Sequence, residues 1–202
     1  MVDLRSARRI HIVGVAGAGM SGLAKLLAQA GHDVSGSDLK PARVLISLEG
    51  LGVATWTGHR PADAAASDLV VVSSAVPDRD PEVRAARAAG VEVWERPRLL
   101  AAMTAETPAL GLTGTHGKTT TTALTVAGLR ALGRDPSFMV GGQLADLNTN
   151  AHLGEPGLFV LEADEAFGTF IELTLRGLTV TSIEADHLDY YETIERLEAS
   201  FA

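Results

Sequence analysis

The stretch RRIHIVGVAGAGMSGLAKLLAQAG, residues 8–31, decides the fold of the first part of the chain. An apolar strand pattern leads into a G-x-G-x-x-G turn at Gly17, Gly19 and Gly22, and an Ala/Leu-rich helix follows. Such glycines allow a tight turn and a close approach of the backbone to a diphosphate, whose charge is met by N–H groups at the helix start. Asp38 follows at about the spacing of a carboxylate that bonds a ribose hydroxyl. The pattern predicts a nucleotide site but does not distinguish NAD from a UDP-sugar, and such glycines can also serve helix–strand packing alone.

Apolar β-branched runs alternate with helical stretches through the first half of the chain, which is typical of a parallel sheet covered by helices. The expected strands lie near residues 8–15, 33–37, 53–56, 68–73 and 91–94, and the expected helices near 20–30, 41–50 and 80–89. This layout predicts a Rossmann-like domain over residues 1–105. A helical connector is expected after Glu95, because Pro97 suits a first helical turn.

The alternation restarts in residues 106–202, which predicts a second, P-loop α/β domain. A strand is expected at 108–113, a long helix at about 117–132, and further strands in the apolar runs 157–162 and 178–183. The last ten residues, TIERLEASFA, have a helical pattern with Ile194, Leu197 and Phe201 on one face and no capping residue after it. The second domain is therefore expected to be incomplete.

Composition narrows the classes of function. The chain has 202 residues, 46% of them hydrophobic and 21% charged, with a formal net charge of −8. No Lys/Arg block is present to attract nucleic acid or an anionic bilayer, so neither is an expected partner. The absence of cysteine excludes disulfides and Cys-based zinc sites. No apolar stretch after MVDLRSARR suits a signal peptide or a membrane span, so we expect a cytoplasmic protein without membrane insertion. The oligomeric state is not predicted.

A second glycine-rich turn follows the strand pattern PALGLTG. It resembles a P-loop, although Leu112 stands where the general pattern G-x-x-x-x-G-K-[ST] asks for glycine. Backbone N–H groups of such a loop wrap the phosphates, Lys118 reaches the β and γ oxygens, and the Thr119 hydroxyl faces Mg²⁺. The residues expected to bind ATP are Gly114, Thr115, His116, Gly117, Lys118, Thr119 and Thr120.

Acidic residues and a histidine follow the two later strand patterns. The first strand pattern ends at Glu162 and is followed by Asp164 and Glu165. The second is followed by Asp186 and His187. Carboxyl ends of strands in an open parallel sheet share an edge with the P-loop, so these groups can converge on one nucleotide site. Hard oxygen ligands beside phosphates are what Mg²⁺ selects. Taken alone, either group can also be a solvated surface turn.

Six segments together resemble one family. VGVAGAGMSGLA (13–24), VSGSD (34–38), VVSSAV (71–76), TGTHGKTTTT (113–122), LEADE (161–165) and IEADHLDYY (183–191) occur in the order typical of Mur ligases that act on UDP-N-acetylmuramate. The resemblance runs from about residue 8 to the end of the chain. It departs at Ser182, where the family commonly has Asn, and at Ala166 and Phe167, where it commonly has Ser-Asp. These departures bear on the geometry of the metal site.

The resemblance implies a set of roles. The UDP-sugar would be bound by Gly17, Ala18, Gly19, Met20, Ser21, Asp38, His59, Ser73, Ser74 and Ala75, with Val76 in the same groove. A purely structural role is the alternative for His59. Thr119, Glu162, Glu165 and His187 would bind Mg²⁺, with Glu162 preferred over Glu165 as the bridging ligand. Lys118, Glu162 and His187 would form the catalytic group.

The implied reaction is ATP-dependent. The lactyl carboxylate of UDP-N-acetylmuramate would attack the γ-phosphate of ATP, and L-alanine would capture the acyl phosphate, with Lys118 and Mg²⁺ neutralising charge. Because complete ligases of the family are longer, this chain is expected to bind substrate without turnover. The alternatives are a ligase of the same family that recycles murein tripeptide, a non-catalytic UDP-sugar-binding module, and a dehydrogenase that binds NAD.

Three further residues are expected to be structural. Trp56 and Trp94 lie in strand patterns and are interpreted as core or strand-edge residues. His11 alternates with apolar neighbours in the first strand and is also expected to be structural.

Overall fold

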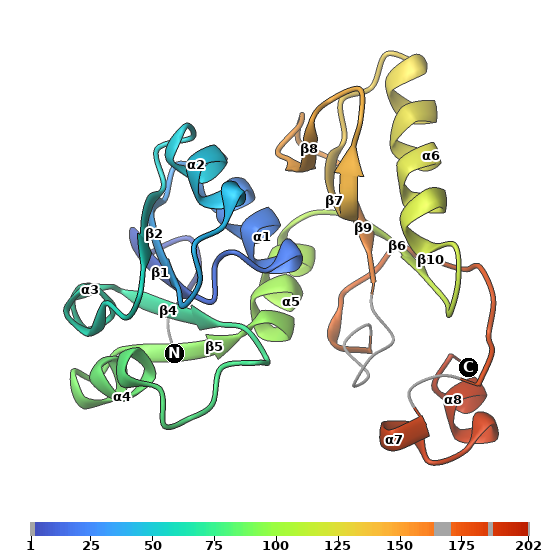
Figure 1. Ribbon diagram of the computed structural model, residues 1–202. Coiled ribbons are helices and arrows are strands. Elements are labelled where there is room, and N and C mark those ends of the chain that lie inside the picture. Colours follow the sequence, from blue (N-terminus) through green and yellow to red (C-terminus); the bar gives the residue numbers. More distant parts are fainter. Residues whose placement is uncertain (1–2, 164–170, 186–187, 202) are drawn as a thin grey trace. The chain divides into compact units, whose positions relative to one another are not determined.

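The computed structural model describes residues 3–163, 171–185 and 188–201, and its contacts divide the chain into two compact units, Met1–Leu99 and Leu100–Ala202 (Figure 1). The division falls within helix α5 (Arg96–Glu106), just before the domain boundary that the sequence predicts at 105/106. The extents of the functional domains stay a prediction.

The first unit contains a five-stranded sheet in the order β3-β2-β1-β4-β5. Its strands are β1 (Arg9–Val13), β2 (Asp33–Asp38), β3 (Ala54–Thr57), β4 (Leu69–Val72) and β5 (Glu92–Glu95), and every pairing is parallel. The Rossmann-like parallel sheet expected from the sequence is confirmed. The strand order changes direction at β1, so the carboxyl ends of β1 and β4 flank the switch point where ligands of such sheets bind.

Helices cover both faces of this sheet (Figure 1). They are α1 (Ala18–Gln29), α2 (Arg43–Glu49), α3 (Pro61–Ala66) and α4 (Pro81–Ala88). The short helix α3 was not predicted, because its sequence PADAAA is too brief to show a helical period. The central strands are fully buried, with Ile10, Ile12 and Leu69 at 0% exposure.

The second unit contains a sheet in the order β10-β6-β9-β7-β8. Its strands are β6 (Ala109–Thr113), β7 (Ser137–Leu144), β8 (Thr149–His152), β9 (Phe159–Glu162) and β10 (Gly177–Val180), and the long helix α6 (Lys118–Ala131) follows β6. The pairing of β7 with β8 is antiparallel and the others are parallel. The sequence did not predict β7 and β8, because polar residues and glycines dilute their apolar pattern. Phe138, Val160 and Val126 form part of the core.

The remaining elements are α7 (Leu188–Tyr191) and α8 (Ile194–Ser200), and Leu197 on the predicted apolar face of α8 is buried. Along the described ranges, none of the helices combines the length and the apolar character needed to cross a membrane. Trp94 is 4% exposed and Trp56 lies half-buried in the strand at the sheet edge, as expected for structural tryptophans.

Candidate functional site

The first glycine-rich turn connects β1 to α1. Asp38, at the end of β2, holds this turn: one carboxylate oxygen accepts from Ala16 N at 3.1 Å and the other from Lys40 N at 3.1 Å. Helix α1 begins after Gly17 without a side-chain cap and without an acidic residue in its first turn. The helix start therefore keeps its partial positive charge for an external anion.

A cavity of about 370 Å³ opens beside this turn. Five predicted UDP-sugar residues line it together: Gly17, Asp38, His59, Ser73 and Ala75. Val76 from the same predicted groove also lines it, as do Lys40, Pro77, Asp80 and Glu82. Segments 14–17, 37–40, 59 and 73–77, which are distant in sequence, thus meet at one groove.

The other five predicted UDP-sugar residues do not line the cavity. Ala18 and Gly19 lie at the start of α1, where their backbone could face a phosphate. The side chains of Met20 and Ser21 are buried, and the Ser21 hydroxyl donates to Ala18 O. Ser74 is exposed. For Met20 and Ser21, any ligand contact would therefore have to come from the backbone.

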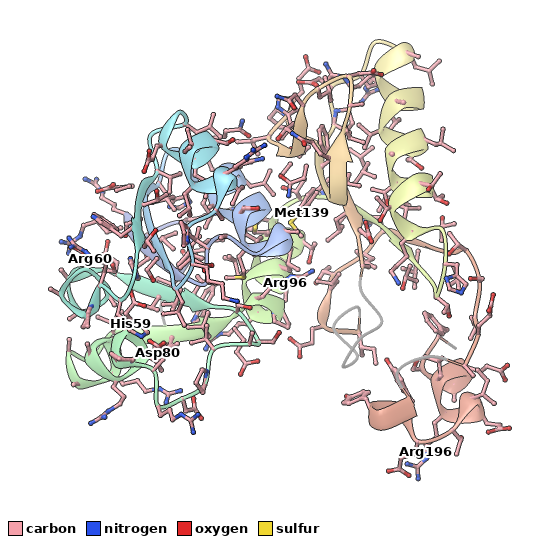
Figure 2. The ribbon with its side chains drawn as sticks, in the orientation of Figure 1. His59, Arg60, Asp80, Arg96, Met139 and Arg196 are labelled. Carbon is pink, nitrogen blue, oxygen red and sulfur yellow. The ribbon has the colours of Figure 1, made fainter. Side chains whose placement is uncertain are left out.

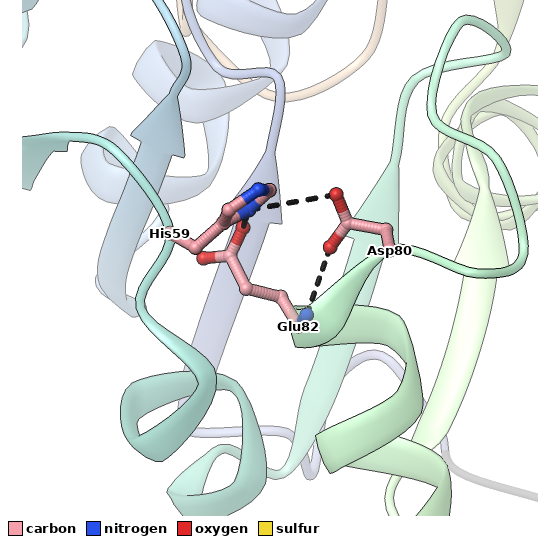
Figure 3. A group of neighbouring side chains, drawn as sticks. All are labelled: His59, Asp80 and Glu82. Atoms are coloured by element: carbon pink, nitrogen blue, oxygen red, sulfur yellow. Dashed lines mark hydrogen bonds and ion pairs between the residues drawn. The ribbon is translucent and has the colours of Figure 1, made fainter.

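A buried carboxylate, Glu82 on α4, organises the floor of the groove. It is 1% exposed, and four polar groups lie within hydrogen-bonding distance of its carboxylate oxygens. They are Arg60 N at 2.8 Å, the Ser37 hydroxyl at 2.8 Å, His11 Nε2 at 3.0 Å and His59 Nδ1 at 3.3 Å. Figure 3 shows His59 between Glu82 and Asp80, with Nδ1 at 3.5 Å from Asp80 Oδ2. His59 therefore lines the groove and is also positioned by these two carboxylates, and its contact with a ligand stays a prediction.

The environment of Glu82 stabilises its ionised form. Burial by itself raises the pKa of this carboxyl, but the hydrogen bonds from His11, Ser37 and Arg60 outweigh burial and lower the pKa from 4.5 to about 2.

His59, Asp80 and Glu82 have the donor types of a metal site and lie within reach of one another. Because N–H and O–H donors already occupy the Glu82 oxygens, we assign this cluster to hydrogen bonding. Fully buried His11 has the structural role expected of it.

The second glycine-rich turn connects β6 to α6 in the other unit. Gly114 has φ +123° and Gly117 has φ +82°, a left-handed backbone that glycine adopts without strain. Lys118, the first residue of α6, donates from Nζ to Gly114 O at 2.7 Å and so spans the loop. These are the backbone and side-chain features expected of a phosphate-binding loop.

Thr119 and Glu162 meet at the carboxyl end of the sheet. The Thr119 hydroxyl lies 3.0 and 3.1 Å from the two carboxylate oxygens of Glu162, which ends β9. Gly141 N, on neighbouring β7, donates to the same carboxylate at 2.7 Å. A hydroxyl and a carboxylate beside a phosphate loop form a donor set that suits Mg²⁺, so these residues fit the expected metal.

The segment after β10 supports the phosphate loop from the side. Ser182 O accepts from Thr115 N at 2.9 Å, and the Ser182 hydroxyl accepts from His116 N at 3.1 Å. Thr181 donates from its hydroxyl to Thr113 O at 3.0 Å and also to His116 O. Ser182, where the family commonly has Asn, thus holds the loop backbone directly.

Some predicted residues lie outside the described residues: Asp164, Glu165, Ala166, Phe167, Asp186 and His187. Their roles stay predictions. Sequence reasoning missed Asp80 and Glu82, because charged residues at the start of an Ala/Arg-rich helix resemble a solvated face. It also missed Gly141, which lies within the unpredicted strand β7, and Thr181, which directly follows β10.

The chain is similar to proteins of one known family along nearly all of its length. The model of the Mur ligase family, catalytic domain, matches residues 9–107, and the model of the Mur ligase middle domain matches residues 112–202. A UDP-N-acetylmuramate–L-alanine ligase from Renibacterium salmoninarum is 42% identical over 200 residues, covering 99% of this chain and 43% of the relative.

Solved structures agree. UDP-N-acetylmuramate-alanine ligase from Thermotoga maritima has a TM-score of 0.88 at 31% identity, covering 96% of this chain and 46% of its own. UDP-N-acetylmuramate:L-alanyl-gamma-D-glutamyl-meso-diaminopimelate ligase from Neisseria meningitides has a TM-score of 0.86 at 29% identity, covering 97% of this chain and 67% of its own. This chain thus spans less than half of the length of the curated relative and of the first structure. With two family models covering nearly all of its residues, the chain belongs to the Mur ligase family.

Proposed function

We propose that this chain carries the UDP-sugar-binding part and a first portion of the ATP-binding part of a ligase that joins L-alanine to UDP-N-acetylmuramate. The observation that carries the proposal is the pairing of Thr119 with Glu162 beside the Lys118 loop. A dehydrogenase that binds NAD at the first glycine-rich turn would not require this second phosphate-binding loop. The groove around Gly17 and His59 supports the UDP-sugar as the other nucleotide ligand.

In this proposal the lactyl carboxylate attacks the γ-phosphate of ATP and ADP leaves. The amine of L-alanine then attacks the carbonyl carbon of the acyl phosphate, and the amide forms with release of phosphate and a proton. The carboxylate and the triphosphate repel each other, so the loop N–H groups and Lys118 would neutralise charge on the phosphate oxygens and align them. Bound Mg²⁺, held by Thr119 and Glu162, would supply further charge neutralisation at the β and γ oxygens. Glu165 and His187 remain proposed as additional ligands, and a cytoplasmic location remains part of the proposal.

The acceptor is proposed to be L-alanine, because the curated relative at 42% identity is named for that amino acid. A second candidate is a murein peptide, supported by the TM-score of 0.86 to the diaminopimelate-containing peptide ligase. Turnover by the 202-residue chain is not expected, because the complete relatives extend well beyond it.

Calorimetric titration tests the two binding sites separately. The chain should bind UDP-N-acetylmuramate in preference to NAD, and it should bind ATP with Mg²⁺. Lys118→Ala should abolish ATP binding and leave UDP-sugar binding unchanged. Arg134→Ala, which removes an exposed cation elsewhere in the same unit, is the matched control. Preference for NAD, or ATP binding that survives Lys118→Ala, would refute the proposal. Formation of UDP-N-acetylmuramyl-alanine would refute the expected lack of turnover.

A further inference from the structure

Arg96, the first residue of α5, carries a cation that no described residue neutralises. Its Nε atom is buried and has no hydrogen-bond partner, and none of the ion pairs among residues 3–163, 171–185 and 188–201 includes it. A half-buried guanidinium with an unsatisfied N–H is costly, since the donor has given up water without receiving an acceptor. An external anion could therefore be the partner that none of the described residues supplies.

The guanidinium lies against the glycine-rich turn of the first unit. A Cβ built on Gly19 would come within 3.0 Å of Arg96 Cζ, 3.1 Å of Nε and 3.2 Å of Nη1. Figure 2 shows Arg96 at the start of α5, close to α1. Because glycine has no side chain, the guanidinium has room to approach the helix backbone at Gly19. The backbone conformation of Gly19 does not require glycine, so this close approach is the feature that does.

Two sources of positive charge thus meet at one place. The first turn of α1 has no side-chain cap and no acidic residue, so its N–H groups carry the positive end of the helix dipole. Arg96 adds a full charge beside the second residue of that helix. Two neighbouring positive groups repel each other, and an anion bound between them would offset that repulsion. Gly17, one residue before the helix, lines the groove, so the groove's ligand can supply that anion.

We propose that Arg96 binds the diphosphate of the UDP-sugar and acts together with the N–H groups of α1. This inference rests on the proposed function of the groove and adds a specific cation to it. The two or more N–H groups of a guanidinium suit phosphate oxygens, and hydrogen bonds between charged groups are about twice as strong as neutral ones. Arg96, which precedes Pro97 in the connector helix, is thereby a ligand-binding residue.

Titrations with uridine, UDP and UDP-N-acetylglucosamine test the proposal in the 202-residue chain. Arg96→Ala should weaken UDP and UDP-N-acetylglucosamine binding by about 10- to 100-fold and leave uridine binding within about twofold. Arg96→Lys should fall in between, because a single ammonium replaces the planar fork. Arg98→Ala is the control: this neighbouring cation stacks on Trp94 and pairs with Glu92, and its loss should change affinity by less than about twofold.

Gly19→Ala provides a second test that keeps the charge. The new Cβ displaces the guanidinium, so UDP binding should weaken by about tenfold or more, while alanine at this helical position should preserve or raise thermal stability. In the double variant the two losses should not add, since both remove the same contact.

The outcomes separate the inference from the proposed function. Equal UDP-N-acetylglucosamine affinity of the wild-type chain and the Arg96→Ala variant would overturn the inference alone. An effect of Arg96→Ala that appears in a further titration with UDP-N-acetylmuramate but not with UDP would also overturn it, by pointing to the lactyl carboxylate. Wild-type chain that binds none of the uridine nucleotides would overturn the proposed function and the inference with it.

Discussion

Replacing Glu82 by glutamine tests whether the carboxylate beneath the groove is ionised and structurally important. The substitution keeps the shape of the side chain and removes the charge. The carboxylate accepts from Ser37 and from Arg60 N in the folded state, whereas the glutamine amide would direct its own N–H group at one of these donors. The first unit should therefore be destabilised even though no volume is lost.

The magnitude follows from the pKa of Glu82, which folding lowers from 4.5 to about 2. At about 1.4 kcal/mol per pKa unit, the ionised carboxylate contributes about 3 kcal/mol to the free energy of unfolding at pH 7. Because the folded pKa is depressed, this stabilisation is complete above pH 4.5 and is lost as the pH falls toward 2. At pH 3 only about 1 kcal/mol should remain.

Urea unfolding of wild type and Glu82→Gln at several pH values measures this directly. Both tryptophans of the chain, Trp56 and Trp94, lie in the first unit, so their fluorescence reports that unit alone. The difference between the two proteins should be about 3 kcal/mol at pH 7 and should shrink by about 2 kcal/mol at pH 3. Glu49→Gln, which alters an exposed carboxylate bonded to one hydroxyl, should show a difference below about 0.5 kcal/mol. A small or pH-independent difference for Glu82→Gln would refute the reasoning.

Three further predictions concern the second unit. Gly114→Ala would place a Cβ 2.6 Å from Ser182 O at φ +123°, so it should destabilise this unit by about 2 kcal/mol or more and abolish ATP binding, measured by thermal unfolding and calorimetry. Gly128→Ala, in α6 with open space around it, should instead raise stability by about 0.5–1 kcal/mol; destabilisation there would contradict the helical assignment. Thr119→Val should weaken the Mg²⁺ dependence of ATP binding in isothermal titrations, and an unchanged dependence would remove Thr119 from the metal site.

Local patterns explain why so much of the fold could be predicted. The turn around Gly17 and the loop ending at Lys118 each lie between one strand and the next helix, so their chemistry is encoded in about ten consecutive residues. The β7-β8 hairpin could not be predicted, because its identity depends on burial against β9 and not on its own period.

Long-range contacts limited what the sequence could say about the sites. Glu82 meets His11 across 71 residues and Ser37 across 45, and no pattern along the chain marks such a meeting. The same holds for Arg96, whose importance depends on where the start of α5 lies relative to Gly19. Asp38 was singled out by its spacing, yet its observed bonds go to the turn backbone, so its contact with a nucleoside remains a prediction.

The departure from the family at residue 182 illustrates how structure changes the meaning of a sequence difference. In the sequence, Ser182 in place of Asn raised a question about the metal site. In the structure, the Ser182 hydroxyl and carbonyl both accept from the phosphate loop, at His116 N and Thr115 N. The hydrogen bonds that hold the loop therefore come from backbone groups beyond β10, which any residue can supply, and from the hydroxyls of Thr181 and Ser182. A change in the position of this segment would move the loop with it, so residue 182 bears first on the phosphates and only through them on the metal.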